Sequence, residues 1–100
     1  MDQMIGTAAA PTGSASADGL IKDGDTQSFN VDVVEASRQR PVIVDFWADW
    51  CEPCKQLMPA LEAAGTQAGG AVALVKINAD QNQQLCTQLQ VQSLPTVLAF

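Results

Sequence analysis

The sequence predicts an α/β sandwich, a sheet covered by helices on both faces. Residues 42–47 and 71–78 are rich in β-branched residues and almost entirely apolar on both faces, which is typical of strands buried on both sides. Segments with helical spacing of apolar side chains lie before, between and after these two strands. The predicted order is strand, helix, strand, helix, strand, helix, strand, and such alternation favours the α/β class.

The first part of the domain is predicted from short local signals. Residues 20–22 form a short strand, and the turn-rich residues 23–25 follow it. Thr26 or Ser28 then caps a helix that ends before Pro41. The apolar side of this helix is predicted to contain Phe29, Val33 and Val34.

A longer helix is predicted after the strand at residues 42–47. Apolar residues recur there at helical spacing, and three glycines mark its end. The apolar residues are Leu57, Met58, Leu61 and Ala64, and the glycines are Gly65, Gly69 and Gly70.

The last elements follow the strand at residues 71–78. Asp80 or Asn82 is expected to cap a short helix whose buried side contains Leu85, Cys86 and Leu89. Residues 93–96 then lead into a final strand at 97–100. Cys86 on this helix is expected to be a buried apolar residue, with a regulatory thiol as the alternative.

Length and composition predict one folded domain. The chain has 100 residues, of which 47% are hydrophobic and 16% charged, and it lacks an apolar run long enough to cross a bilayer. Residues 6–19 are small and polar without a periodic apolar face, so we expect a flexible tail over residues 1–19. The domain is therefore assigned to residues 20–100, and we expect it to be a monomer.

The charge and the cysteine count predict a cellular location and exclude two classes of partner. Eleven acidic against five basic residues give a net charge of −6, without a basic cluster that would bind nucleic acid or an anionic membrane. The first residues lack the basic start and the apolar stretch of a secretory signal. Three cysteines, an odd number, favour a reducing compartment. We therefore expect a cytoplasmic protein.

Two cysteines at the start of the longer helix carry the strongest functional signal. Cys51 and Cys54 are separated by two residues, which places both sulfurs within one helical turn. A helix N-terminus favours an anion, so Cys51 is expected to be an exposed thiolate nucleophile. Cys54, one turn further in and less exposed, would resolve the mixed disulfide. Pro53 fits the first helical turn and limits the separation of the sulfurs.

Two other readings of the cysteine pair remain open. A CxxC pair is half of a structural zinc site, which requires four ligands, but the chain has no histidine and only one other cysteine. The pair could also be chemically inert. The preferred reading has no metal and no cofactor apart from the redox-active disulfide of Cys51 and Cys54.

The sequence around the two cysteines resembles the thioredoxin family. Residues 45–55, Asp-Phe-Trp-Ala-Asp-Trp-Cys-Glu-Pro-Cys-Lys, are similar to the active-site stretch of that family at nearly every position. Pro59 and residues 76–78 and 94–96 also fall where the family places them. The resemblance covers residues 20–100 and implies a three-layer sandwich with a central mixed sheet.

The resemblance implies proton transfer by a buried carboxylate. Asp45 lies in an otherwise apolar strand, where burial should raise its pKa and let it deprotonate Cys54. Lys76, on the neighbouring strand, could modulate Asp45. The alternatives are an Asp45 that reaches solvent and an exposed Lys76 at the end of a strand.

The resemblance also implies a substrate-binding surface. Pro95 would be the cis proline that this fold places opposite the dithiol. The backbone at Leu94 and Thr96 would pair with an extended client segment beside Cys51. Trp50 is expected to contact the substrate. The implied partners are disulfide-containing client proteins and thioredoxin reductase.

The sequence departs from the family at two places. Glu52 stands where thioredoxins most often have glycine, and its charge should raise the pKa of the neighbouring Cys51 slightly. The family has a further edge strand and a last helix after the position of Phe100, so we expect a C-terminally incomplete domain. Residues 21–29 and 35–41 are similar to the leading domain of bacterial thioredoxin-like co-chaperones with a helical-repeat tail.

Two functions follow from these features. The first is a protein-disulfide reductase in which Cys51 attacks and Cys54 resolves. The alternative is a redox-active module that captures client proteins for a co-chaperone. Turnover of a model disulfide distinguishes the two.

Overall fold

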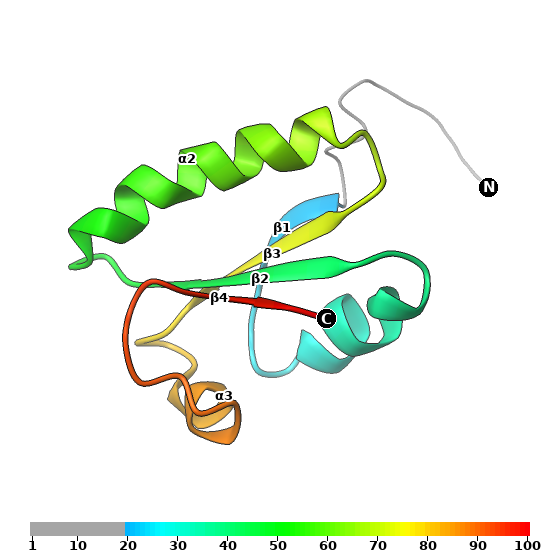
Figure 1. The fold of residues 1–100 in the computed structure, drawn as a ribbon. Helices are drawn as coiled ribbons and strands as arrows, with labels where there is room; N and C mark the ends of the chain where they lie inside the picture. Colours follow the sequence, from blue (N-terminus) through cyan, green and yellow to red (C-terminus); the bar gives the residue numbers. More distant parts are fainter. Residues whose placement is uncertain (1–19) are drawn as a thin grey trace.

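The computed structural model describes residues 20–100, and the prediction of a flexible tail at residues 1–19 lies outside this range. The described residues form a four-stranded sheet in the order β1-β3-β2-β4 (Figure 1). The strands are β1 (Ile21–Gly24), β2 (Val42–Trp47), β3 (Ala73–Asn78) and β4 (Thr96–Ala99). Strands β1 and β2 pair with β3 in parallel, and β4 pairs antiparallel with β2. The predicted α/β fold with a central mixed sheet is confirmed.

Helices cover both faces of the sheet. Helix α2 (Glu52–Gln67) lies on one face, and the π-helix η1 (Asn30–Glu35), the 3₁₀-helix η2 (Ala36–Arg38) and helix α3 (Gln83–Gln88) lie on the other (Figure 1). Within residues 20–100, none of these helices has the length and apolar character needed to cross a membrane.

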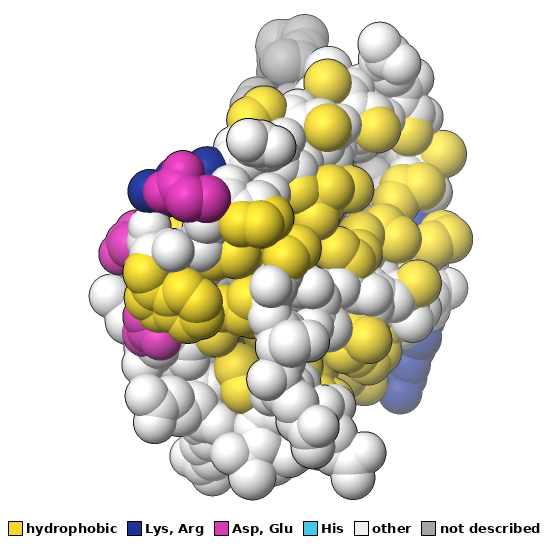
Figure 2. All heavy atoms as spheres, turned by 60° about the vertical axis from the view of Figure 1, so that its left-hand side comes forward, with side chains coloured by type: hydrophobic (Ala, Val, Ile, Leu, Met, Phe, Trp, Pro, Cys, Tyr) yellow, Lys and Arg dark blue, Asp and Glu magenta, His cyan; other side chains and the backbone are white. Residues whose placement is uncertain are grey.

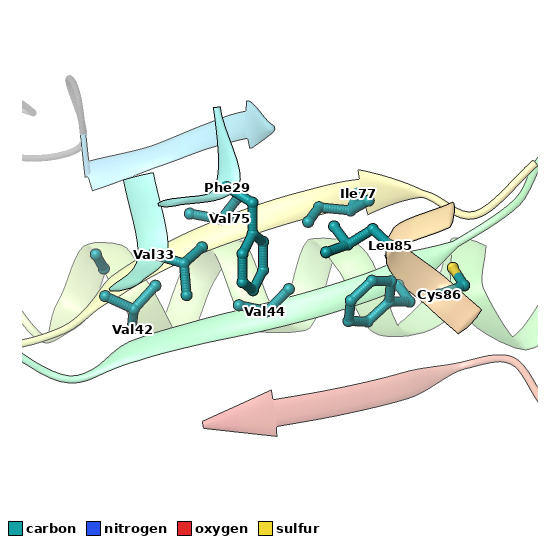
Figure 3. Close-up of a cluster of buried hydrophobic side chains, with 10 residues drawn as sticks. Phe29, Val33, Val42, Val44, Val75, Ile77, Leu85 and Cys86 are labelled. Atoms are coloured by element: carbon teal, nitrogen blue, oxygen red, sulfur yellow. The ribbon is translucent and has the colours of Figure 1, made fainter. Parts of the chain in front are cut away.

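The main core lies between the sheet and the face that carries η1 and α3. Alternate residues of β2 and β3 point to this face, because successive side chains of a strand point to opposite sides. Figure 3 shows apolar side chains of the sheet meeting those of the helices above them. The buried residues labelled there are Phe29, Val33, Val42, Val44, Val75, Ile77, Leu85 and Cys86.

The helix after β1 differs from the prediction in type and in its cap. It is a π-helix followed by a 3₁₀ turn, and Val34 is exposed while Val33 is buried. The prediction that Val34 shares the buried side of this helix with Phe29 and Val33 is therefore wrong, because Val33 points into the core and Val34 points to solvent. The Ser28 amide donates to Asp25 Oδ1 at 2.8 Å, and the Asp25 amide donates to Ser28 Oγ at 3.1 Å.

Thr26 does not cap the helix but bonds to the residue that precedes α3. Its amide and its hydroxyl both donate to Asn82 Oδ1, at 2.8 and 3.1 Å. Asn82 immediately precedes α3 and is buried, and its Nδ2 donates to the Asn78 carbonyl at 2.9 Å. The Asn82 side chain therefore links the turn after β1 to the end of β3 and does not cap α3.

The long helix begins where the sequence predicts and continues past the first of its three glycines. α2 runs through Pro59 and Gly65 to Gln67. Gly69 and Gly70 have φ angles of +59° and +96°, a conformation that favours glycine, and they turn the chain into β3.

Candidate active site

The two cysteines of the motif form a disulfide at the start of α2. Cys51 is the N-cap of α2 in an extended conformation, and its Cα lies 5.3 Å from the Cα of Cys54. The Cys54 amide donates to Cys51 Sγ at 3.3 Å. This amide belongs to the first turn, whose N–H groups lack carbonyl partners within the helix. The same amide can stabilise negative charge on Cys51 when the pair is reduced.

The loop from β2 to α2 fixes the position of Cys51. Trp47 ends β2, and the Cys51 amide donates to the Ala48 carbonyl at 3.1 Å. Ala48, Cys51 and Cys54 form a small buried cluster against which Trp47 and Leu94 pack. The sulfurs are thus held by the end of the central strand and by the segment before β4.

The expected exposure of Cys51 is wrong for the disulfide form. Cys51 is 3% exposed and Cys54 is fully buried, so both residues are largely covered. The packing of Leu94 and Trp47 against the disulfide accounts for this burial. Cys51 nevertheless remains the more accessible of the two.

The segment opposite the disulfide has the predicted backbone geometry. The peptide bond between Leu94 and Pro95 is cis. Leu94 packs against both the main core and the cysteine cluster, and Thr96 begins β4. The structure thus brings Leu94 beside the dithiol, as the sequence predicts.

Trp50 projects from the protein next to Cys51. It is 67% exposed, and its indole Nε1 donates to Asp80 Oδ2 at 3.0 Å. Trp50 and Leu94 line an open cavity of about 330 Å³, which also includes Cys86. Figure 2 shows this end of the molecule, where hydrophobic side chains form a continuous area with acidic side chains at its margin. Sequence reasoning missed Asp80 as the group that orients Trp50.

Asp45 lies in β2 on the face that α2 covers and is completely buried. Among residues 20–100, neither of its carboxylate oxygens has a hydrogen-bond partner. Burial raises the pKa of Asp45, the Lys76 ammonium opposes this rise, and the Glu62 charge adds to it. Asp45 is therefore buried, as the sequence predicts, and burial moves the pKa of its carboxyl in the expected direction.

Lys76 lies directly beside Asp45 in the register of β2 and β3. Its ammonium, however, donates to Glu62 Oε2 at 2.6 Å and lies 3.8 Å from Asp23 Oδ1. The hydrogen bond to Glu62 raises the pKa of Lys76, although burial opposes that rise. Sequence reasoning did not find Glu62. Its position could have identified it, because Glu62 is an acidic residue eight positions after Cys54 on the side of the helix that faces the sheet.

Cys86 is the free cysteine of residues 20–100 and is buried on α3. Burial raises the pKa of its thiol, and the charge of Asp80 adds to the effect. A thiol with a raised pKa is a poor nucleophile at neutral pH. These features fit the structural reading of Cys86. Within the described part of the chain, no group of three or more potential protein ligands is arranged to hold a metal ion.

Comparisons with known proteins agree with this geometry. A family model described as thioredoxin matches residues 21–100. A thioredoxin of Streptomyces clavuligerus is 43% identical over 82 residues, which are 82% of this chain and 74% of that protein. A bifunctional thioredoxin reductase/thioredoxin of Mycobacterium leprae is 40% identical over 73 residues, which are 73% of this chain and 16% of that protein. The solved structure of chloroplastic thioredoxin z matches with a TM-score of 0.73 at 36% identity, covering 80% of this chain and 69% of that one.

This chain belongs to the thioredoxin family. Thioredoxins are protein-disulfide oxidoreductases that work through their own redox-active disulfide, and the Cys51–Cys54 pair supplies it here. The chain is therefore a thiol–disulfide oxidoreductase. The family and the function that the sequence predicts are both confirmed.

Glu52, which the sequence resemblance marks as a departure from the family, lies next to Cys51 at the start of α2. Its carboxylate is exposed and accepts a hydrogen bond from Lys55 Nζ at 3.2 Å. This neighbouring cation partly compensates the negative charge beside Cys51. The repulsion expected from the sequence is therefore reduced in the folded protein.

Proposed function

We propose that this chain reduces disulfides in client proteins, with Cys51 as the nucleophile and Cys54 as the resolving thiol. The observation that carries the assignment is the position of the pair: Cys51 is the N-cap of α2, and Cys54 lies within the first turn. The N-terminus of α2 stabilises a thiolate at Cys51 more than at Cys54, because the dipole effect falls off within one turn.

The reaction proceeds in two exchanges. The Cys51 thiolate attacks one sulfur of the client disulfide, forms a mixed disulfide and releases the other client sulfur as a thiolate that takes a proton. Cys54 then loses its proton and attacks the Cys51 sulfur, which breaks the mixed disulfide and releases the second client thiol. Two electrons pass from the dithiol to the client, and the Cys51–Cys54 disulfide forms.

Asp45 is the proposed base for the second exchange. It lies beneath α2, and its raised pKa allows the carboxyl to take a proton from Cys54 and return it near neutral pH. Lys76 modulates Asp45 through its charge.

The client segment is proposed to bind along the surface that connects Trp50 and Leu94. Trp50 has an exposed aromatic ring, and the segment before β4 lines the cavity beside it. Backbone groups at Leu94 and Thr96, on either side of Pro95, would pair with an extended peptide. Pairing through the main chain tolerates many client sequences.

The dithiol must be restored after each turnover. Members of this family are reduced by thioredoxin reductase, and the matched M. leprae protein carries both names. We propose that a thioredoxin reductase reduces this chain too, and that the chain acts as a monomer in the cytoplasm. Cys51, Cys54 and Asp45 are the proposed catalytic residues, with Pro53 stiffening the motif.

Reduction of insulin, with dithiothreitol as the electron source, tests this function. We expect the folded chain to accelerate precipitation of the insulin B chain, and Cys51→Ser and Cys54→Ser to lose turnover. A folded, unmutated chain without turnover would contradict the reductase. If such a chain still bound unfolded clients, and did so after Cys51→Ser, the client-binding module would be the better account.

A further inference from the structure

The Lys76 ammonium lies among three carboxylates, and its strongest contact is not with the proposed base. Its Nζ is 2.6 Å from Glu62 Oε2 and 3.8 Å from Asp23 Oδ1. Asp45 is its direct neighbour across β2 and β3. Within residues 20–100, however, the oxygens of Asp45 accept no hydrogen bond. The cation is therefore bonded to Glu62 of α2 and not to the buried carboxyl beside it.

This orientation affects the chemistry of Asp45. A buried carboxylate that paired directly with a lysine would be held in its ionised form and would be a weak base. Lys76 is well placed to make such a pair, because its side chain is only 16% exposed and shares the register of Asp45. Glu62 competes for the same ammonium from the neighbouring helix.

We propose that Glu62 is a positioning residue that holds Lys76 away from Asp45 and thereby keeps Asp45 able to exchange a proton with Cys54. The inference rests on the proposed role of Asp45 as the base. Glu62 acts through Lys76 and through its own charge, and both effects favour the protonated form of Asp45.

The charged and titratable groups around Asp45 come from several elements. Strand β3 contributes Lys76, and α2 contributes Glu62 and, in the proposed reaction, the thiol of Cys54. Strand β1 contributes Asp23, which acts on Lys76. The residue opposite Asp45 on β4 is Val97, which does not titrate. Glu62 is the anion in direct hydrogen-bond contact with Lys76.

The test is a titration of the Asp45 carboxyl carbon by ¹³C NMR in the folded, oxidised chain. We expect the midpoint to move to lower pH in Glu62→Gln, because the freed ammonium turns toward Asp45. The midpoint should move to higher pH in Lys76→Gln. Glu62→Ala, which preserves helix propensity, should move it in the same direction as Glu62→Gln and serves if the latter does not fold.

Glu35→Gln is the matched control. It removes the same charge from the opposite face of the sheet, where Glu35 contacts the Asn30 side chain at 3.3 Å. We expect this variant to leave the midpoint unchanged. Displacements of opposite sign in Glu62→Gln and Lys76→Gln would not arise from a purely structural role of either residue.

The pH profile of insulin reduction, measured on the same variants, completes the test. We expect the profile to shift in the same direction as each NMR midpoint. An unmoved or raised midpoint in Glu62→Gln, with insulin turnover intact in the unmutated chain, would overturn the role of Glu62 alone. A lowered midpoint with an unmoved pH profile would instead overturn the role of Asp45, and with it this inference.

Discussion

Asp45 is a carboxyl group in a position that disfavours its charge. Its side chain is completely buried, and its neighbours across the sheet are Lys76 and Val97. Because burial raises its pKa above the ordinary value of 3.8, the folded state binds a proton more tightly than the unfolded chain does. Protonated Asp45 contributes its full stabilisation when the pH is below the ordinary pKa of 3.8. This stabilisation is lost as the pH rises through the pKa of the folded state.

Asp45→Asn should therefore remove a pH dependence of stability. We expect the unmutated chain to lose unfolding free energy as the pH rises from about 4 toward neutrality, and the variant to lose less and to be the more stable at pH 7. The rate of mixed-disulfide resolution should fall about 10²-fold or more, because the base is lost. Urea denaturation across pH and stopped-flow kinetics check the two effects. The exposed Asp49→Asn is the control, and an equal effect there would contradict the account.

Glu52 gives a second prediction at the scale of one residue. Glu52→Gly should lower the pKa of the Cys51 thiol, because the variant removes a negative charge beside the thiolate. The effect should be modest, since Lys55 already pairs with this exposed carboxylate. A titration of thiolate absorbance at 240 nm on the reduced chain measures it. Glu52→Gln should shift the pKa in the same direction, and an increase in either variant would contradict the electrostatic reading.

At the scale of elements, β2 and α2 position the chemistry. β2 ends at Trp47, and a short loop connects it to Cys51. α2 begins at the next residue, Glu52. Both elements are predictable from local sequence, because β2 has a continuous apolar run and α2 has helical periodicity after a capping position. The π-helix η1 was not predictable in the same way, since its widened turns depend on packing against the sheet.

Two glycines allow a paired test of packing between elements. A Cβ at Gly24 would lie 2.6 Å from Val75 Cγ1, so Gly24→Ala should destabilise the fold by about 1–3 kcal/mol. Gly65 lies inside α2, and a Cβ there would lie 3.4 Å from Ile21 Cδ1 of β1, which is an ordinary van der Waals distance. Gly65→Ala should therefore stabilise the fold by about 0.5–1 kcal/mol. Urea denaturation measures the free energy of unfolding of both variants. A Gly24→Ala variant that is more stable than the unmutated chain would contradict the packing described.

At the scale of the whole molecule, the fold brings together groups that are distant in sequence. The dithiol and the buried Asp45 were predictable from their local sequence, whereas the cis bond before Pro95, opposite the dithiol, was expected only from the resemblance to the thioredoxin family. The contact between Lys76 and Glu62 was not predictable, because it depends on which carboxylate a long side chain reaches across two layers. The bond from Trp50 to Asp80 was missed for the same reason.

The arrangement also explains the asymmetry of the two sulfurs. Both cysteines are buried in the disulfide, so exposure alone does not separate their roles. Their positions on α2 do, since Cys51 caps the helix and Cys54 lies inside it. The free Cys86, buried on α3 with a raised pKa, should not compete with them.

Trapping of the mixed disulfide tests the central claim most directly. The chain with Cys54→Ser, reduced and incubated with insulin, should form a covalent adduct through Cys51 that intact-protein mass spectrometry detects and dithiothreitol releases. Cys86→Ser added to this variant should leave the adduct unchanged, and Cys51→Ser with Cys54 intact should form little or none. An adduct that forms equally well through Cys54, or that disappears with Cys86→Ser, would contradict the assignment of Cys51 as the nucleophile.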